Sequence, residues 1–204
     1  MGKSSSGVHG NYNGRVGNVV ARSINGMTVL SAYNPNVSNP KTLLQQSNRY
    51  RLSALTKFLK RYSGLLKYNF HYIGTKQTKN YFSSAVGYNA KINGIYIDGQ
   101  IEYKLIMMSV GNVQQLDKLS VFLDDGWLAF IWDSESGSPS DEISIAIYNP
   151  LDDKYGYYYN AALRRDNRFQ LDVSDIADND AFVWVSVRDS KGLCSNSQCF
   201  IFER

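Results

Sequence analysis

The chain has 204 residues, of which 43% are hydrophobic, so it is long enough to fold as one large or two small domains around a buried core. The polar start, Met1 to Ser6, and the lack of any apolar run of roughly 20 residues predict an intracellular protein without a membrane span or a secretion signal. Cys194 and Cys199 are expected to be reduced thiols, because a bridge between them would close only a short loop.

Positive and negative residues are separated along the chain. Residues 1–97 contain 13 Lys and Arg and no Asp or Glu, whereas residues 98–204 contain nine Lys and Arg and all 18 acids. This pattern predicts a basic region over 1–97 and an acidic domain over 98–204. It indicates either a polyanionic partner such as nucleic acid or head-to-tail association of identical copies. The alternative is that the fold brings both halves together and they neutralise each other.

The first 40 residues are rich in Gly, Asn and Ser and contain two short apolar runs, Val16–Ala21 and Met27–Leu30. Asn25-Gly26 is typical of a type I′ turn, so we expect a β-hairpin from about residue 15 to residue 32. The polar residues before the hairpin are expected to form an extended arm that becomes ordered on a neighbouring molecule.

Two basic helices are predicted to follow. Asn39-Pro40 is a helix start signal, and apolar residues at steps of three and four extend this helix to about Tyr62, with Gly64 as its stop. The second helix is expected from about Thr75 to Ile92 and should end at Asn93-Gly94.

After Asp98 the hydrophobic period changes to two. Eight short strands are predicted, with turn signals such as Asp124-Asp125-Gly126 between them: Ile101–Ser109, Leu119–Leu123, Trp127–Trp132, Ile143–Tyr148, Tyr155–Leu163, Phe169–Val173, Phe182–Val187 and Cys199–Phe202. The fold class is therefore predicted as α+β, with a Gly-rich N-terminal arm and β-hairpin, two basic helices and an antiparallel immunoglobulin- or fibronectin-like β-sandwich.

No pattern in the sequence predicts catalysis, a cofactor or a metal site. The N-terminal glycines lack the spacing of a phosphate-binding loop, and His9 and His71 have no nearby carboxylate or cysteine. Three acid pairs are expected to face solvent at strand ends: Asp124-Asp125, Asp141-Glu142 and Asp152-Asp153. A fourth acidic cluster is interpreted as a corner of the sandwich rather than a calcium site: Asp172, Asp175, Asp178 and Asp180.

Basic and aromatic residues are the candidates for an interface. The chain has fifteen tyrosines, and Tyr is favoured where a ring is buried against a partner while its hydroxyl stays hydrated, although a Tyr-rich strand can also be an ordinary sandwich face. The predicted interface residues are Arg15, Arg22, Arg49, Lys57, Lys60, Arg61, Tyr155, Tyr157 and Tyr159.

Three segments carry a resemblance to a known family: Gly14–Val20, Asn39-Pro40 followed by Gln46 and Arg49, and Asn80–Asn89. They resemble an uncharacterised domain family of Bacteroidota and their phages, most specifically over the first 95 residues. The resemblance implies a bacterial or phage origin and no catalytic residues. The setting most consistent with it is the virion of a crAss-like phage, assembled in the bacterial host cytoplasm, where small proteins stack as rings beneath the portal in the neck and tail. The implied partners are copies of the chain itself and neighbouring portal or tail components.

Two other functions remain open. In a sequence-independent nucleic-acid-binding protein, the basic helices, with Arg49, Lys57, Lys60 and Arg61, would lie along the phosphates of DNA, including the phage genome, with a steep dependence on salt. A hydrolase of cell-wall or capsular glycan would need an acid pair on facing strands, and the sequence offers no convincing one.

Overall fold

The structure is a computed structural model that describes residues 3–4, 12–24, 27–36, 38–73, 76–78, 80–176 and 181–202. The chain forms two compact units, residues 1–42 and residues 43–204, which we call the N-terminal unit and the main unit. This division falls after Thr42, whereas the charge pattern predicted a division after Ile97. The reason is that the helices of residues 43–89 share a hydrophobic core with the sheet strands of the acidic half.

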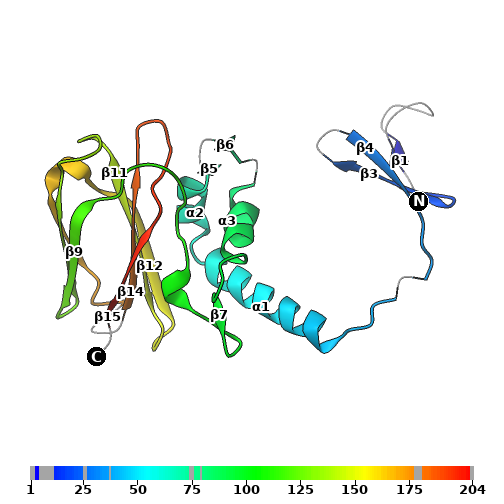
Figure 1. Ribbon diagram of the computed structural model, residues 1–204, viewed down its shortest axis with the longest axis horizontal. Helices are drawn as coiled ribbons and strands as arrows, with labels where there is room; N and C mark the ends of the chain where they lie inside the picture. The colour runs from blue at the N-terminus through cyan, green and yellow to red at the C-terminus, as the bar shows by residue number, and fades with distance from the viewer. Residues whose placement is uncertain are drawn as a thin grey trace. The chain divides into compact units, whose positions relative to one another are not determined.

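The N-terminal unit is an antiparallel sheet in the order β1-β2-β3-β4 (Figure 1). Its strands are Lys3–Ser4, Tyr12–Val16, Val19–Ile24 and Met27–Ala32. The predicted hairpin is confirmed as β3 paired with β4, and the Asn25-Gly26 turn between them lies outside the described residues. The predicted arm is wrong for β2, which pairs with β3, because Gly17 takes up a left-handed conformation (φ 60°) that reverses the chain there.

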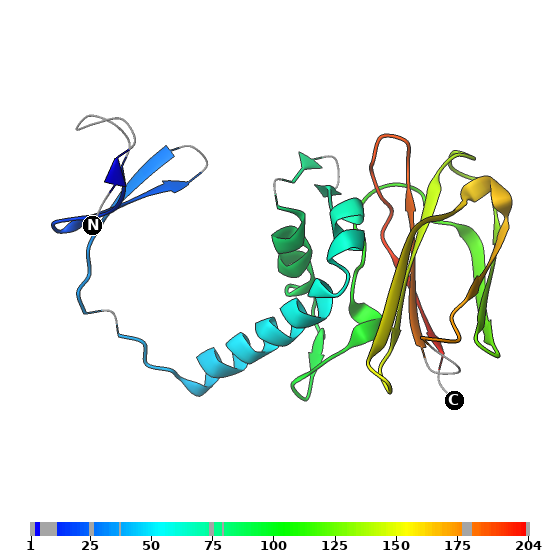
Figure 2. The same ribbon diagram turned by 180° about the vertical axis from the view of Figure 1, so that it is seen from behind.

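The main unit consists of three layers (Figures 1 and 2): a three-stranded sheet, a four-stranded sheet and a layer of helices. The strand orders are β13-β10-β9 and β12-β11-β14-β15, and all pairs are antiparallel. The strands are β9 (Asp117–Asp124), β10 (Trp127–Asp133), β11 (Glu142–Asn149), β12 (Lys154–Leu163), β13 (Arg168–Asp172), β14 (Ala181–Arg188) and β15 (Gln198–Phe202). Seven of the eight predicted strands are thereby confirmed.

The turn between β9 and β10 has the geometry that its sequence predicts. Asp125 and Gly126 both have positive φ, 44° and 76°, and Asp124 pairs directly with Trp127. A type I′ turn needs two such residues, and its twist matches that of the flanking strands.

The predicted strand Ile101–Ser109 is wrong. Its residues form the end of β8 (Gln100–Ile101), the 3₁₀ turn η1 (Tyr103–Leu105) and an extended segment that pairs with no strand of the described part of the chain. Side chains satisfy the backbone of this segment instead. Asn89 Oδ1 accepts a hydrogen bond from the backbone N–H of Met107 at 2.8 Å, and Ser197 Oγ accepts one from Met108 at 2.9 Å. The apolar alternation correctly indicates burial, because Ile106 and Met108 are buried. It does not indicate which groups form hydrogen bonds with the backbone of the segment.

Three helices cover the four-stranded sheet: α1 (Leu43–Lys60), α2 (Ser63–Asn69) and α3 (Tyr81–Asn89). A short hairpin of β5 (Tyr72–Ile73) and β6 (Lys76–Gln77) lies between α2 and α3, and a second one, of β7 (Tyr96–Ile97) and β8, follows α3. Among the described residues, no helix is both long and apolar enough to cross a membrane.

The helix ends differ from the predicted ones. Gly64 does not stop a helix but lies inside α2, where a Cβ atom would come within 2.6 Å of Tyr157 Oη, so the glycine permits close approach to β12. The second predicted helix begins later than expected, because Asn80 Oδ1 accepts a hydrogen bond from the Ser83 N–H and caps α3 there.

The four-stranded sheet is buried on both faces. Ile143, Ile145 and Ile147 of β11 pack toward the three-stranded sheet, while Ala146 and Tyr148 of the same strand pack toward the helices. On β14, Val183, Val185 and Val187 lie in the core between the two sheets, and Trp184 lies in the core between the sheet and the helices. This double burial explains why β11 and β14 are apolar over nearly their whole length.

Candidate interface

Arg15 and Arg22 lie on the same face of the N-terminal sheet, because Arg15 pairs with Val20, which shares a side of β3 with Arg22. Arg15 Cζ lies 3.4 Å from the centroid of the Tyr33 ring. We call this surface the arginine face. The described residues of the opposite face include no charged side chain, and we call that surface the apolar face: Val16, Val19, Ala21, Leu30 and Ala32.

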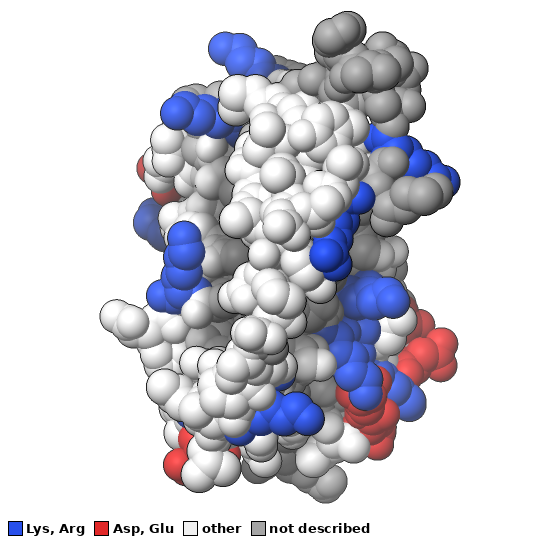
Figure 3. All heavy atoms as spheres, turned by 90° about the vertical axis from the view of Figure 1, so that its right-hand side faces the viewer, with Lys and Arg blue, Asp and Glu red and all other residues white. Residues whose placement is uncertain are grey.

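Arg49, Lys57 and Lys60 lie along α1, which contains no acidic residue. They border a shallow hollow of about 550 Å³, which is also lined by Leu52, Ser53 and Thr56. The N-terminal half of the helix exposes Leu43 and Leu44. Lys and Arg side chains predominate over acids on the face shown in Figure 3. This helix is therefore a basic, partly apolar surface suited to an acidic partner.

Arg61 joins the basic part of the sequence to the acidic part. Its Nη1 and Nη2 atoms donate to Asp153 Oδ1 and Oδ2, each at 2.6 Å, and Tyr148 Oη also donates to Oδ1, at 2.9 Å. The hydrogen bonds from Arg61 lower the pKa of Asp153 below its usual value. This ion pair neutralises one charge of the basic half with one of the acidic half, which is the kind of contact that the alternative interpretation of the charge pattern predicted.

The three predicted tyrosines of β12 face the helices. Tyr155 and Tyr157 lie against the ring of Tyr62, with centroid distances of 5.7 and 6.2 Å, and Tyr159 lies 5.5 Å from Tyr68. Tyr157 is half-buried, whereas Tyr155 and Tyr159 remain 46% and 58% exposed. These rings thus hold the helix layer on the sheet, and their role between molecules stays a prediction.

A second hollow, of about 450 Å³, lies beside Tyr159. Arg188 Cζ is 3.9 Å from the centroid of Tyr68, whose hydroxyl donates to Glu142. Burial raises the pKa of Tyr68, so its hydroxyl stays protonated at neutral pH. His71 also lines this hollow, and its Nε2 lies 3.1 Å from Gln77 Nε2. The arrangement offers cation and aromatic contacts but no activated nucleophile.

The sequence reasoning missed the outer face of the three-stranded sheet. Phe122, Trp127 and Ile131 are 55%, 50% and 53% exposed. Phe122 pairs with Ala129, which lies between Trp127 and Ile131 on the same side of β10, so the four side chains are contiguous. We call this surface the outer patch. The signal for it was present, because both sides of β10 carry apolar residues where a strand with one solvated face would alternate.

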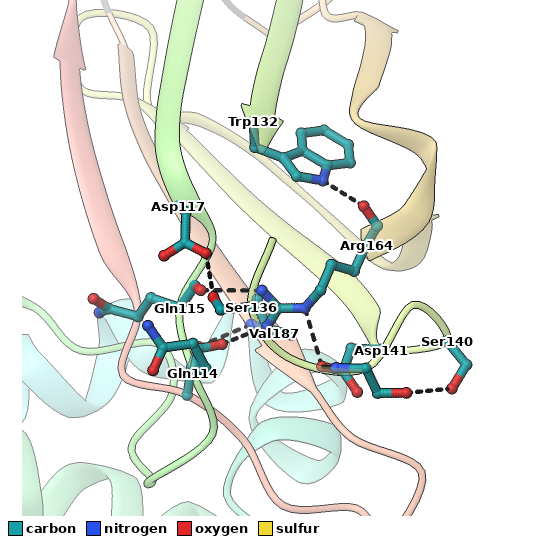
Figure 4. A network of polar contacts seen from close by, with 11 residues as sticks. Gln114, Gln115, Asp117, Trp132, Ser136, Ser140, Asp141, Arg164 and Val187 are labelled. Carbon is teal, nitrogen blue, oxygen red and sulfur yellow. Dashed lines mark hydrogen bonds and ion pairs between the residues drawn. The ribbon is translucent and has the colours of Figure 1, made fainter. Parts of the chain in front are cut away.

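Asp141 was expected to face solvent, and this is wrong. It is 3% exposed and pairs with the fully buried Arg164, whose Nε lies 3.1 Å from Asp141 Oδ2 (Figure 4). Arg164 Nη1 and Nη2 donate to the backbone oxygens of Gln115 and Gln114, at 3.1 and 2.6 Å, and its own carbonyl accepts from Trp132 Nε1 at 2.7 Å. The network anchors the chain segment that enters β9. It is a structural pair, since every polar atom of the guanidinium is used.

The acidic cluster that begins at Asp172 forms a turn in its described part. Asp172 Oδ1 accepts hydrogen bonds from the N–H and hydroxyl of Ser174, which lower the pKa of Asp172, while Asp178 and Asp180 lie outside the described residues. The described residues hold no group of three or more His, Cys, Asp and Glu that could bind a metal. Cys194 and Cys199 are free thiols, and burial raises the pKa of both to about 12.

Comparison with known proteins places the chain in a family. Residues 10–197 match the sequence profile of a family of unknown function, DUF6266. The chain belongs to the DUF6266 family. This DUF6266 chain matches no curated protein. Among solved structures it is similar to the fn3 domain of human contactin 1, with 8% identity and a TM-score of 0.28 over 47% of this chain and 86% of that one. At that TM-score the likeness carries no argument.

Proposed function

We propose that this chain is a structural assembly protein whose copies associate head to tail, basic surface on acidic surface, to form a ring in the neck or tail of a phage virion beneath the portal. The observation that carries the proposal is the charge segregation: 13 cations and no acid in residues 1–97 against a net −9 in residues 98–204. Two different surfaces of opposite sign on one chain make a heterologous contact, which closes into a ring when the rotation fits.

The local pairing of Arg61 with Asp153 uses one charge of each sign and leaves most of the asymmetry in place. The α1 surface with Lys57 and Lys60 stays basic, and Asp124, Asp125 and Asp172 lie exposed on the three-stranded sheet and its turn. The virion setting rests on the resemblance of Gly14–Val20 and Asn80–Asn89 to the uncharacterised domain family of Bacteroidota and their phages, with a crAss-like phage as the setting inferred from it.

The proposal includes an immunoglobulin- or fibronectin-like sandwich in residues 117–202. The first, second and fifth strands form one sheet, and the third, fourth, sixth and seventh form the other. This distribution supports the finer assignment, because such sandwiches divide seven antiparallel strands between two sheets by Greek-key connections.

Light scattering of the purified chain at low and high salt tests the assembly. We expect a discrete oligomer at low salt that dissociates as salt screens the contact. Reversing two charges of α1, in Lys57→Glu with Lys60→Glu, should reduce the oligomer, whereas Lys191→Glu, in the acidic half, should not. A chain that stays monomeric at every salt concentration contradicts the proposal.

A second candidate function is sequence-independent binding of nucleic acid. The hollow on α1 between Arg49, Lys57 and Lys60 favours it, since closely spaced cations follow a phosphate backbone. Fluorescence anisotropy with labelled duplex DNA separates the two functions. Salt-sensitive DNA binding by a monomer would support this candidate and remove the ring.

A further inference from the structure

The N-terminal sheet has an apolar face that the described residues of its own unit leave largely exposed. Among the described residues of 1–42, Ala21 is the only buried apolar one, and the apolar face leaves Val16 54%, Val19 37% and Leu30 56% exposed. A single sheet layer must bury its apolar face against another layer to be stable. The N-terminal unit therefore requires a partner surface that is flat and apolar.

The outer patch of the main unit has the matching character. It presents Phe122, Trp127 and Ile131 on a three-stranded sheet, beside a hollow of about 620 Å³ lined by residues of β10 and β13. Two sheets pack face to face about 10 Å apart through apolar side chains of this kind. The outer patch could thus continue the stack of layers with one more sheet.

The N-terminal unit and the Trp127 end of the outer patch carry opposite charges, while Arg168 lies beside Ile131 at the other end of the patch. Residues 1–42 contain Lys3, Arg15, Arg22 and Lys41 and no acid. The Trp127 end of the outer patch is bordered by Asp124 and Asp172, which pair with Trp127 in the register of the sheet. In the docked sheet the arginine face would point away from the outer patch, so its cations would lie more than about 10 Å from these carboxylates, and salt would screen the attraction between them at physiological ionic strength.

We propose that the apolar face of the N-terminal sheet of one copy docks on the outer patch of a second copy. This inference rests on the proposed head-to-tail assembly and names its two surfaces. The segment from residue 33 to residue 42 spans up to about 35 Å when extended, which lets the sheet reach a neighbouring molecule. Since the two surfaces differ, each copy donates one sheet and accepts another, so the contact propagates around a ring.

Disulfide trapping between single variants tests the contact. We mix the full-length variants Leu30→Cys and Phe122→Cys under mild oxidation and expect a covalent dimer that neither variant gives alone. Met27→Cys is the matched control: it is 68% exposed and lies on the arginine face, so its mixture with Phe122→Cys should give no dimer. The native thiols do not interfere, because burial keeps them protonated.

The double variant, Leu30→Cys with Phe122→Cys in one chain, identifies the acceptor. We expect a ladder of covalent oligomers, whereas a disulfide within the monomer would mean that the sheet docks on its own chain and would overturn the inference. Absence of any cross-link while light scattering still shows an oligomer would overturn the docking but not the assembly. A monomer in light scattering would overturn both.

A substitution in the outer patch gives an independent readout. Trp127→Glu should weaken self-association at least tenfold, about the smallest effect expected from losing a buried aromatic anchor. Leu151→Glu is the control, since Leu151 is 76% exposed but lies in the turn between β11 and β12. Equal association of both variants with the unmodified chain would contradict the role of the outer patch.

Discussion

The chain contains two four-stranded antiparallel sheets with opposite surroundings. The sheet β12-β11-β14-β15 is buried on both faces, with Trp184 1% and Val183 0% exposed. The sheet β1-β2-β3-β4 has one buried apolar residue among those described and exposes Leu30 and Met27. The two sheets are thus paired alike and differ in how much of their apolar surface is buried. Helices and a second sheet cover the first of these sheets, whereas the described residues of the N-terminal unit form no second layer over the other.

Trp184→Ala should give the largest loss of stability. The side chain fills the core between sheet and helices, so its removal should lower the free energy of unfolding by about 3–5 kcal/mol. Trp127→Ala, at a half-exposed position of the outer patch, should cost under about 1 kcal/mol in the monomer. Urea unfolding monitored by circular dichroism measures both, and equal losses would contradict the contrast between covered and uncovered surfaces.

Arg164→Met should have a similar or slightly smaller effect. The substitution leaves the buried carboxylate of Asp141 without its cation and should lower the free energy of unfolding by about 3–4 kcal/mol. Arg165→Met, at the adjacent exposed position, is the control and should change it by less than about 0.5 kcal/mol. Thermal unfolding of the two variants provides the comparison. A neutral Arg164→Met would mean that Asp141 is readily hydrated.

Arg61→Gln should destabilise the contact between α1 and the sheet only slightly, by up to about 1 kcal/mol, because Asp153 is largely exposed. The effect depends on pH. Since Arg61 lowers the pKa of Asp153, the stabilisation is fully present above the usual Asp pKa of about 3.9 and is lost as the pH falls through the lower folded-state value. Unfolding of both proteins between pH 2 and pH 7 measures this. A difference that persists at the acidic end would assign the loss to packing instead.

Leu30→Ser should have the smallest effect on a single chain. Its side chain is 56% exposed on the apolar face, so the main unfolding transition at high salt and low concentration should shift by less than about 0.5 kcal/mol. Leu59→Ser, fully buried in α1, should cost several times more. A large shift with Leu30→Ser would show that the N-terminal sheet is already covered within one chain.

Much of the fold could be predicted from local signals. The alternation in β9 and β13 and the Asp125-Gly126 turn identify a hairpin-rich antiparallel half, and the three-and-four spacing identifies α1. The 101–109 segment could not be placed, because alternation reports burial and does not say whether a strand or the side chains of Asn89 and Ser197 bind the backbone. Gly64 was misinterpreted for a similar reason, since the tyrosine that it accommodates is distant in sequence.

The positions of the candidate interface residues in the fold could be predicted in part. Arg49, Lys57 and Lys60 do lie together on one helix, as their spacing indicates. The partners of Arg61 and of the β12 tyrosines could not be foreseen, because Asp153 is 92 residues from Arg61 along the chain. The outer patch was missed because apolar residues on both sides of β10 suggest that both sides are buried. Only the order of the layers shows that one side of this strand is exposed.

The segment from Met107 to Ser109 has a consequence for the order of synthesis. The Ser109 hydroxyl donates to the Ser195 carbonyl at 2.7 Å, and Ser197 binds the Met108 N–H, so residues separated by more than 80 positions complete one another. Their hydrogen bonds cannot form until residues 195–197 have left the ribosome. We expect the helices and the first strands of the main unit to remain partly ordered until then, so that this unit folds in one step at the slow rate typical of long-range contacts.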